Sequence, residues 1–239
     1  TGTFQVAQGS LDYIATLLSS LQPKELVVQR DVARAVKERF GDFYVSPLDE
    51  WAFVPEAAEQ KLIRQLGVNS LKGFAIDAFP LAVCSAGALI CYLEQTQHTG
   101  LKNICSISRI DADKFVWMDR FTFRNLEVFA SASGNDGVSL VDVVDKCQSP
   151  MGARMLRSWL AMPVMDIAEL NSRYDVVDYF KGDSEALATI QEYIGNLGDL
   201  ERILSRAATG KILPREVMQL GRGLDQIGPI IETCAQAGV

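Results

Sequence analysis

The sequence predicts two parts, an α/β half that ends near Ala112 and a mostly α-helical half after it. In the first half, short β-branched or aromatic runs alternate with apolar residues at helical spacing, which is typical of a layered α/β domain. After Leu126 nearly every apolar pattern has helical spacing, and several patterns begin with a capping residue. With 239 residues, 48% of them apolar, the chain can bury a sizeable core in one or two domains.

The first half is expected to alternate strands with helices. Strands are predicted at Thr3–Ala7, Glu25–Gln29, Phe43–Val45 and Gly73–Ile76. Helices are predicted at Leu11–Leu21, Val32–Phe40, Pro55–Leu66 and Pro80–Gln95. Proline is well suited to the first turn of a helix, which favours the start at Pro55. The last of these helices is rich in Ala, Ser, Gly and Cys, a composition that predicts close packing against a neighbour.

The second half begins with one more predicted strand, Lys114–Met118, and continues as helices. Ser149 and Pro150 form a helix start, with the capping residue and the first-turn proline in place, and Pro163 ends that helix. Further starts are an Asp variant of the capping box, Asp166 with Glu169, and a cap at Asp199. The helix after Asp199 is closed by Gly210. A last helix is predicted from Pro214 through Ile227.

The charge balance argues against a surface that grips nucleic acid. The net charge is −7, of which −2 falls in residues 1–112 and −5 in residues 113–239, and neither half has a basic stripe. The longest apolar run, between Phe79 and Leu93, is interrupted and shorter than the roughly 18 residues of a membrane span. No secretory signal is visible. We expect a cytoplasmic protein with no membrane partner, and the ends suggest a piece of a longer protein.

Metal and catalytic sites are not predicted. The five cysteines form no Cys-x-x-Cys pair, and His98, the only histidine, lies in a polar stretch where a solvated role is expected. Thr209-Gly210-Lys211 lacks the other residues of a phosphate loop, because Ser205 and Ile212 occupy those positions. A helix-ending glycine explains Gly210 better. Gly221-Arg222-Gly223 follows a helix and lacks the third glycine of a dinucleotide fingerprint.

Three strings of the second half share one order and spacing with a known family. They are Arg-Asn-Leu-Glu at 124–127, Ser-Pro-Met-Gly-Ala-Arg-Met-Leu-Arg-Ser-Trp-Leu at 149–160, and Gly-Asp-Leu-Glu-Arg-Ile-Leu at 198–204. By themselves these are capped helices with arginines facing acids, a structural scaffold. Together they resemble the MutS family of mismatch-recognition ATPases. Leu71-Lys72-Gly73-Phe74 and Ala86-Gly87-Ala88-Leu89 extend the resemblance through the first half, so it covers essentially the whole chain. Phe123 departs from the family's usual basic residue.

The resemblance implies a fold and a division into domains. Residues 1–112 would be most of the connector domain, an RNase-H-like α/β fold that is incomplete at its N-terminus. Residues 113–239 would be the start of the helical core, or lever, domain, incomplete at its C-terminus. In the family these parts transmit ATP state to the DNA end and offer a docking face for MutL. Packed helices suit transmission because they shift as rigid elements.

The chain lacks the family's reactive parts. No phenylalanine is followed two residues later by glutamate, so the mismatch-reading wedge is absent, as are the phosphate loop and the DNA clamp. By the resemblance, this fragment has no catalytic residue and no cofactor. The parent would be an ATPase with ATP and Mg²⁺, a homodimer that binds mismatched double-stranded DNA through the missing domains. The fragment itself is expected to be a monomer.

The resemblance also suggests site residues. The MutL-facing helix would be Glu56–Leu66, with exposed contacts at Gln60, Lys61 and Arg64, because Ala58, Leu62 and Leu66 would point inward at helical spacing. An ordinary solvated helix face explains the same pattern. Interdomain or structural roles are expected for Arg124, Asn125, Glu127, Arg154, Arg157 and Arg202.

Two alternatives stay open. One is a MutS paralogue that acts on recombination intermediates, because the wedge domain is not in this sequence. The other is a metal-dependent RNase-H-like nuclease with Asp31 and Asp77 at strand ends, although two carboxylates are fewer ligands than paired Mg²⁺ ions need. Solvated loop acids explain these two residues as well.

Overall fold

The computed structural model describes residues 2–40, 43–97, 101–133 and 137–236. They form two compact units, Gly2–Asp111 and Ala112–Val239, called here the first and the second unit. The boundary between the two units lies where the sequence changes from alternating strand and helix patterns to helical patterns. His98 lies outside the described residues. Within the described part, no helix is long and apolar enough to cross a membrane.

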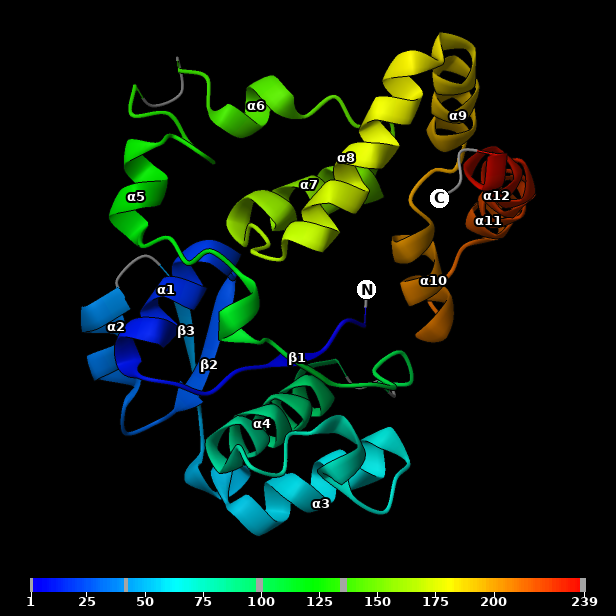
Figure 1. The fold of residues 1–239 in the computed structure, drawn as a ribbon. Coiled ribbons are helices and arrows are strands. Elements are labelled where there is room, and N and C mark those ends of the chain that lie inside the picture. The colour runs from blue at the N-terminus through cyan, green and yellow to red at the C-terminus, as the bar shows by residue number, and fades with distance from the viewer. Residues whose placement is uncertain (1, 41–42, 98–100, 134–136, 237–239) are drawn as a thin grey trace. The chain divides into compact units, whose positions relative to one another are not determined.

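The first unit alternates strands and helices, as expected (Figure 1). Its strands are β1 (Gln5–Val6), β2 (Glu25–Gln29), β3 (Tyr44–Leu48) and β4 (Ser108–Arg109). Its α-helices are α1 (Leu11–Leu21), α2 (Ala33–Phe40), α3 (Pro55–Leu66) and α4 (Pro80–Gln97), with 3₁₀ turns at Glu50–Phe53 and Leu71–Phe74. The described strands form two parallel pairs, β1 with β4 and β2 with β3, in which Glu25 lies opposite Tyr44 and Gln29 opposite Leu48.

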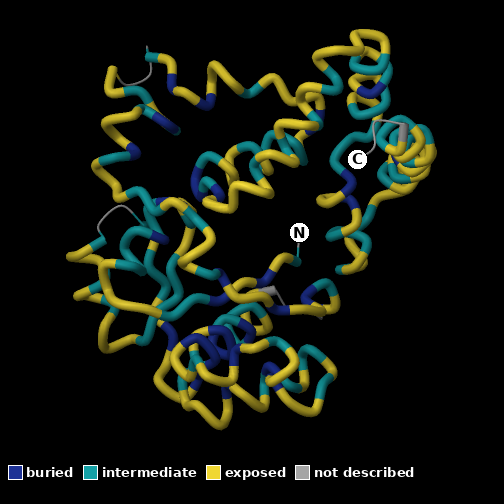
Figure 2. Tube along the Cα trace, in the orientation of Figure 1, coloured by how far each residue is buried: buried dark blue, intermediate teal, exposed yellow. Residues whose placement is uncertain are grey.

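Helix α4 is the centre of the first unit. On one side it packs against α3 and the following turn, where Leu62, Ile76 and Ile90 are fully buried. On another side Ala88 is buried with Leu48 and Ala52, next to β2 and β3. Buried residues therefore lie along much of α4 (Figure 2). Because the helix is covered on more than one side, it lacks the polar face of a surface helix.

Small residues allow α3 and α4 to approach closely. A Cβ added to Gly87 would lie only 2.5 Å from the Cα of Ala58, and both residues are buried. This contact confirms the close packing that the small residues of this helix predict.

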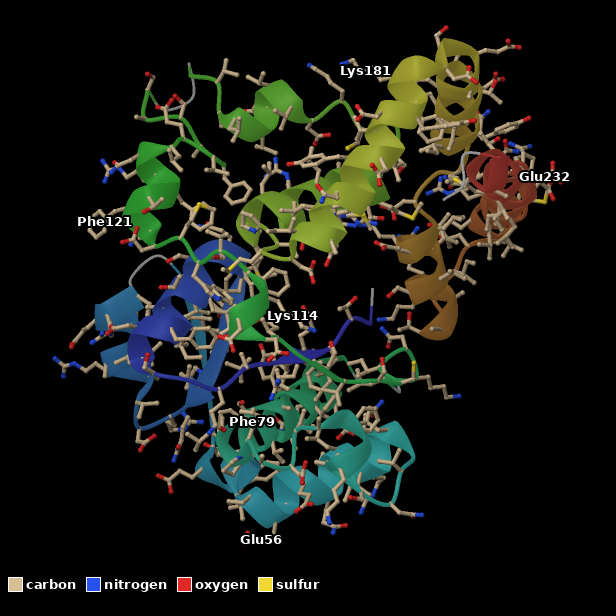
Figure 3. All side chains as sticks on the ribbon, in the orientation of Figure 1. Glu56, Phe79, Lys114, Phe121, Lys181 and Glu232 are labelled. Atoms are coloured by element: carbon tan, nitrogen blue, oxygen red, sulfur yellow. The ribbon has the colours of Figure 1, made fainter. Side chains whose placement is uncertain are left out.

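The start of α4 is capped from a distant part of the chain. The side-chain oxygen of Gln8, in the loop between β1 and α1, accepts hydrogen bonds from the backbone N–H groups of Leu81 (2.9 Å) and Ala82 (3.2 Å). These are first-turn groups with no partner inside the helix. Close by, the guanidinium of Arg109 lies over the ring of Phe79, 5.0 Å from its centroid. Phe79 is labelled in Figure 3. Side chains of the loop after β1 and of β4 thus meet at this helix end.

The second unit is mostly helical, which confirms the predicted change of pattern. Its helices are α5 (Arg120–Asn125), α6 (Leu140–Val144), α7 (Pro150–Ala161), α8 (Ile167–Gly182), α9 (Ser184–Asn196), α10 (Leu200–Ala208), α11 (Pro214–Asp225) and α12 (Ile227–Gln236). The side chains of six residues accept bonds from first-turn N–H groups, namely Asp119, Ser139, Ser149, Asp166, Asp183 and Asp199. The helices therefore begin where short polar side chains can satisfy the backbone.

Two predicted strands are wrong. Leu71–Phe74 is a 3₁₀ turn that leads to a left-handed Ala75 (φ +53°), so Gly73–Ile76 is not a strand. Lys114–Met118 contains a single antiparallel bridge, between Phe115 and Val164, rather than a strand. Both segments are short apolar runs without a neighbouring strand of useful length, and the periodicity of a short run cannot reveal whether such a partner exists.

Two helix predictions need smaller corrections. The helix expected from Pro214 through Ile227 stops at Asp225, and α12 starts at Ile227. Pro229 explains the break, because proline lacks the N–H that a helix interior needs but is tolerated in a first turn. At α8, Asp166 caps the helix as predicted, but the Glu169 carboxylate pairs with Arg173 instead of completing a capping box.

Candidate functional site

The helix predicted to face a partner, α3, has the expected inner and outer faces. Ala58 and Leu62 are buried, whereas Gln60 and Arg64 are exposed. Lys61 differs from these two, because it is only partly exposed and its ammonium pairs with the carboxylate of Glu94 on α4. The ion pair holds Lys61 within the first unit, so Gln60 and Arg64 are the freer contacts.

A hollow of about 330 Å³ lies beside this face. It is lined by Lys61, Arg64, Gln65, Glu94, Leu101 and Lys102. The side-chain amide of Gln65 donates to the carbonyl oxygens of Leu101 (2.8 Å) and Ile104 (2.9 Å), and so holds the segment after α4 against α3. Three basic side chains and one acid give the hollow a net positive lining, which suits an acidic group on a partner.

In the second unit, Arg154 joins two helices through a bidentate ion pair. Its Nη1 and Nη2 each donate to one oxygen of Asp199 at 2.8 Å, and Nη2 also reaches Glu201 at 2.6 Å. Arg154 lies in the middle of α7, and Asp199 caps the start of α10. Two parallel charge-assisted bonds fix orientation as well as distance. The guanidinium holds the pKa of Asp199 below its usual range, and Asp199 in turn raises the pKa of Arg154.

The other expected structural residues have varied surroundings. The Nε of Arg202 lies 3.5 Å from Asp199, one turn along α10. Arg157 is exposed, and its positive charge is a minor cause of the lowered pKa of Asp142, after the bonds from Ser139. Arg124 and Asn125 are exposed at the end of α5.

Glu127 has a clear local role at the end of α5. It adopts a left-handed conformation (φ +48°), and its carboxylate accepts the backbone N–H of Ala132 at 2.6 Å. The side chain therefore closes the turn that follows α5.

The residues considered for metal and phosphate chemistry do not come together. Asp31 and Asp77 are exposed residues in turns. In the part of the chain that the structure describes, no group of three or more His, Cys, Asp or Glu side chains could hold a metal ion. Gly210 (φ +69°) follows the end of α10, whereas a phosphate loop precedes a helix start. The phosphate-loop interpretation of Gly210 is therefore not supported, and Asp31 and Asp77 do not form a metal cluster with other described side chains.

Sequence reasoning missed two acidic partners. The capping motif singled out Asp199, but nothing in it indicated that Arg154, 45 residues earlier, would bind the same carboxylate. Nothing in the sequence near Glu94 indicated that it would pair with Lys61. Both pairings depend on tertiary packing, which local spacing does not encode.

Comparison with known proteins gives the family. The sequence matches the profile of MutS domain II over residues 1–105 and that of MutS domain III over residues 121–238. The DNA mismatch repair protein MutS of Parabacteroides distasonis is 42% identical over 239 residues, which are 100% of this chain and 27% of that protein. The protein of the same name from Christiangramia forsetii is 44% identical over 97% of this chain and 27% of its own length.

The chain therefore belongs to the MutS family and consists of its domains II and III. It spans about a quarter of the length of these relatives, because 27% of each is covered.

Proposed function

We propose that this chain is the noncatalytic connector and lever part of a DNA mismatch-repair ATPase, coupling ATP state to DNA binding and docking a MutL-type protein. Residues 1–112 would be the connector domain, with an RNase-H-like arrangement, and residues 113–239 the start of the core and lever domain. The observation that carries the proposal is the match to MutS domains II and III along nearly the whole chain.

Coupling needs helices that move as units, and the Arg154 ion pair supports this. It connects the middle of α7 to the first turn of α10 through a carboxylate that is itself the helix cap. A displacement of one helix would either carry the other with it or break several charge-assisted bonds. We propose that this joined pair of helices moves between discrete arrangements, as a transmitting part requires.

The coupling proposal is tested in the whole protein that contains this chain. Arg154→Ala should slow ATP-driven release from mismatched DNA while the ATP hydrolysis rate without DNA stays unchanged. Arg157→Ala, on the same helix, is the matched control and should leave both rates unchanged. Wild-type release by the Arg154 variant would contradict the coupling role.

Docking of a MutL-type protein is proposed for the outer face of α3. Gln60 and Arg64 are exposed there, next to the positively lined hollow that includes Lys102. A rigid helix with exposed polar side chains provides contacts at low entropic cost. Lys61 contributes through its ion pair with Glu94, which fixes α3 against α4.

The docking proposal is tested by binding of a purified MutL-type protein to the 239-residue chain. Arg64→Glu should weaken binding by about tenfold or more, since reversing a charge at a contact costs over 1.4 kcal/mol. Arg34→Glu makes the same charge change on α2, at a highly exposed residue, and should bind like the wild type. Equal binding by both variants would show that docking occurs elsewhere.

ATP, Mg²⁺, mismatched DNA and a homodimeric state are proposed for the whole protein alone. The similarity to DNA mismatch repair proteins of two bacteria supports the mismatch-repair role. No chemical step is assigned to the residues of this chain.

A further inference from the structure

A polar pocket of about 670 Å³ lies in the second unit, between α11 and the turn that joins α9 to α10. The end of α9 contributes Gly195 and Asn196 to its walls, and the turn that follows contributes Gly198. Helix α11 contributes a stripe of long side chains. No carboxylate is among the described residues that line this pocket. This composition is unusual in a half that carries a net charge of −5.

Apart from Met218, the side chains that line the pocket from α11 and from Gln226, the residue just after it, are arginines and neutral amides. These arginines and amides follow one another at intervals of four, three and four residues, which places them on one helix face: Arg215, Gln219, Arg222 and Gln226. Within the described residues, neither arginine makes an ion pair. The neighbouring acid, Glu216, binds Arg206 at 2.7 Å and the backbone N–H of Leu213.

The frame of the pocket is set by close backbone contacts. A Cβ on Gly223 would lie 2.6 Å from the carbonyl oxygen of Leu197, so α11 lies directly against the turn. Gly198 has a left-handed φ of +68°, and a Cβ there would lie 2.8 Å from the amide nitrogen of Gln219. The spacing between the walls therefore requires glycine at position 223, and the left-handed backbone favours glycine at position 198. Because these contacts fix the pocket walls before a ligand arrives, less conformational entropy is lost when the ligand binds.

We propose that this pocket binds a phosphate-bearing ligand, with Arg215 and Arg222 on either side of the anion and Gln219 between them. Arginine forks match phosphate oxygens geometrically and bind them with charge-assisted bonds. The two arginines are two turns apart, about 10 Å along the axis, so both can reach one group or a linked pair of groups. The net negative charge of the second unit would repel a long nucleic-acid backbone more than a compact anion held inside the pocket, so we consider a compact anion. This inference does not depend on the proposed function.

The test uses the 239-residue chain and inorganic pyrophosphate, followed by chemical-shift titration. Wild-type protein should bind saturably, with the largest shifts in α11 and in the turn before α10. The double variant Arg215→Gln with Arg222→Gln should bind at least about tenfold more weakly, because it loses bonds to a charged group. The control, Lys181→Gln with Lys211→Gln, removes the same charge from exposed sites outside the pocket (Lys181 is labelled in Figure 3) and should bind normally.

Absence of saturable binding to wild-type protein would overturn the proposal. So would equal weakening in the two double variants, which would show a general charge effect. The source of the phosphate is identified by comparing a nucleoside diphosphate with a short oligonucleotide that has a 5′-phosphate. The class of ligand is identified by the probe that binds the wild-type protein more tightly, provided that the arginine double variant binds this probe at least about tenfold more weakly. The variants change exposed residues, and circular dichroism verifies their fold.

Discussion

At the scale of single residues, Arg154 is the side chain that joins α7 to α10. It is partly buried, and it binds two acids on another helix. Removing it would leave Asp199, only 18% exposed, without its main counter-charge. An uncompensated carboxylate in such surroundings is costly, although water still reaches part of it.

We expect Arg154→Ala to lower the free energy of unfolding by about 1–2 kcal/mol, because the charge-assisted bonds are lost at a partly solvated site. Arg157→Ala is the matched control on α7. It should change stability by less than about 0.5 kcal/mol, as expected for an exposed side chain. Urea unfolding of both variants measures the difference. Similar stabilities would show that the ion pair contributes little.

The same ion pair should make stability depend on pH. Because Arg154 holds the folded-state pKa of Asp199 below its unfolded value, the contribution is fully present above the unfolded pKa of about 3.9. It is lost as the pH falls from there through the folded pKa. The stability difference between wild type and Arg154→Ala should therefore shrink below about pH 4. Urea unfolding at pH 7 and at lower pH tests this, and a constant difference would contradict it.

The sequence predicted which side chains are exposed better than it predicted their partners. Helical spacing placed Ala58 and Leu62 inside and Gln60 and Arg64 outside, as the structure has them. The ion pair of Lys61 was not foreseen, since Glu94 lies 33 residues further along and meets it only through helix packing.

At the scale of elements, the contact between α3 and α4 depends on Gly87. Any side chain at this position would collide with the backbone of Ala58. Since Leu62 and Ile90 are fully buried in the adjoining core, the two helices cannot separate without exposing apolar surface.

We expect Gly87→Ala to destabilise the chain by about 1–3 kcal/mol, the usual cost of overpacking, despite the better helix propensity of alanine. Gly182→Ala is the control, because nothing lies within 4 Å of a Cβ at the end of α8. It should be neutral or stabilising by up to about 1 kcal/mol. Thermal unfolding measures the stability of both variants. If Gly87→Ala raised the stability, α3 and α4 could move apart to accept the added methyl group, which would contradict the prediction.

Helices were predicted well because their starts are marked locally. Pro55–Leu66 has the predicted ends, and Ser149 and Asp199 cap helices as expected. The two failed strands, Gly73–Ile76 and Lys114–Met118, are short segments without a partner strand of useful length, which local pattern does not reveal. Ile76 is fully buried although its segment is a turn, so an apolar run alone could not distinguish it from a strand.

At the scale of the whole molecule, the two units differ in how their apolar residues are buried. The main core of the first unit uses residues from Phe4 to Ile107, all inside Gly2–Asp111. The second unit leaves large apolar side chains exposed on several helices, among them Phe121, Ile167 and Met218.

We therefore expect residues 2–111 to fold when expressed alone, with one cooperative thermal transition and dispersed proton resonances. Residues 112–239 alone should bind a hydrophobic dye more strongly, because exposed apolar surface is the site of such binding. Circular dichroism, NMR and dye fluorescence compare the two pieces. A first unit without a cooperative transition would show that its core is insufficient.

The cap that Gln8 places on α4 has a consequence for biosynthesis. Ribosomes deliver a chain from its N-terminus, so the capping side chain leaves the exit tunnel more than 70 residues before the helix that it completes. The first turn of α4 can be satisfied as soon as it emerges. If α4 were synthesised before Gln8, the backbone N–H groups of its first turn would stay exposed to water until Gln8 was made. Vectorial synthesis thus favours this arrangement.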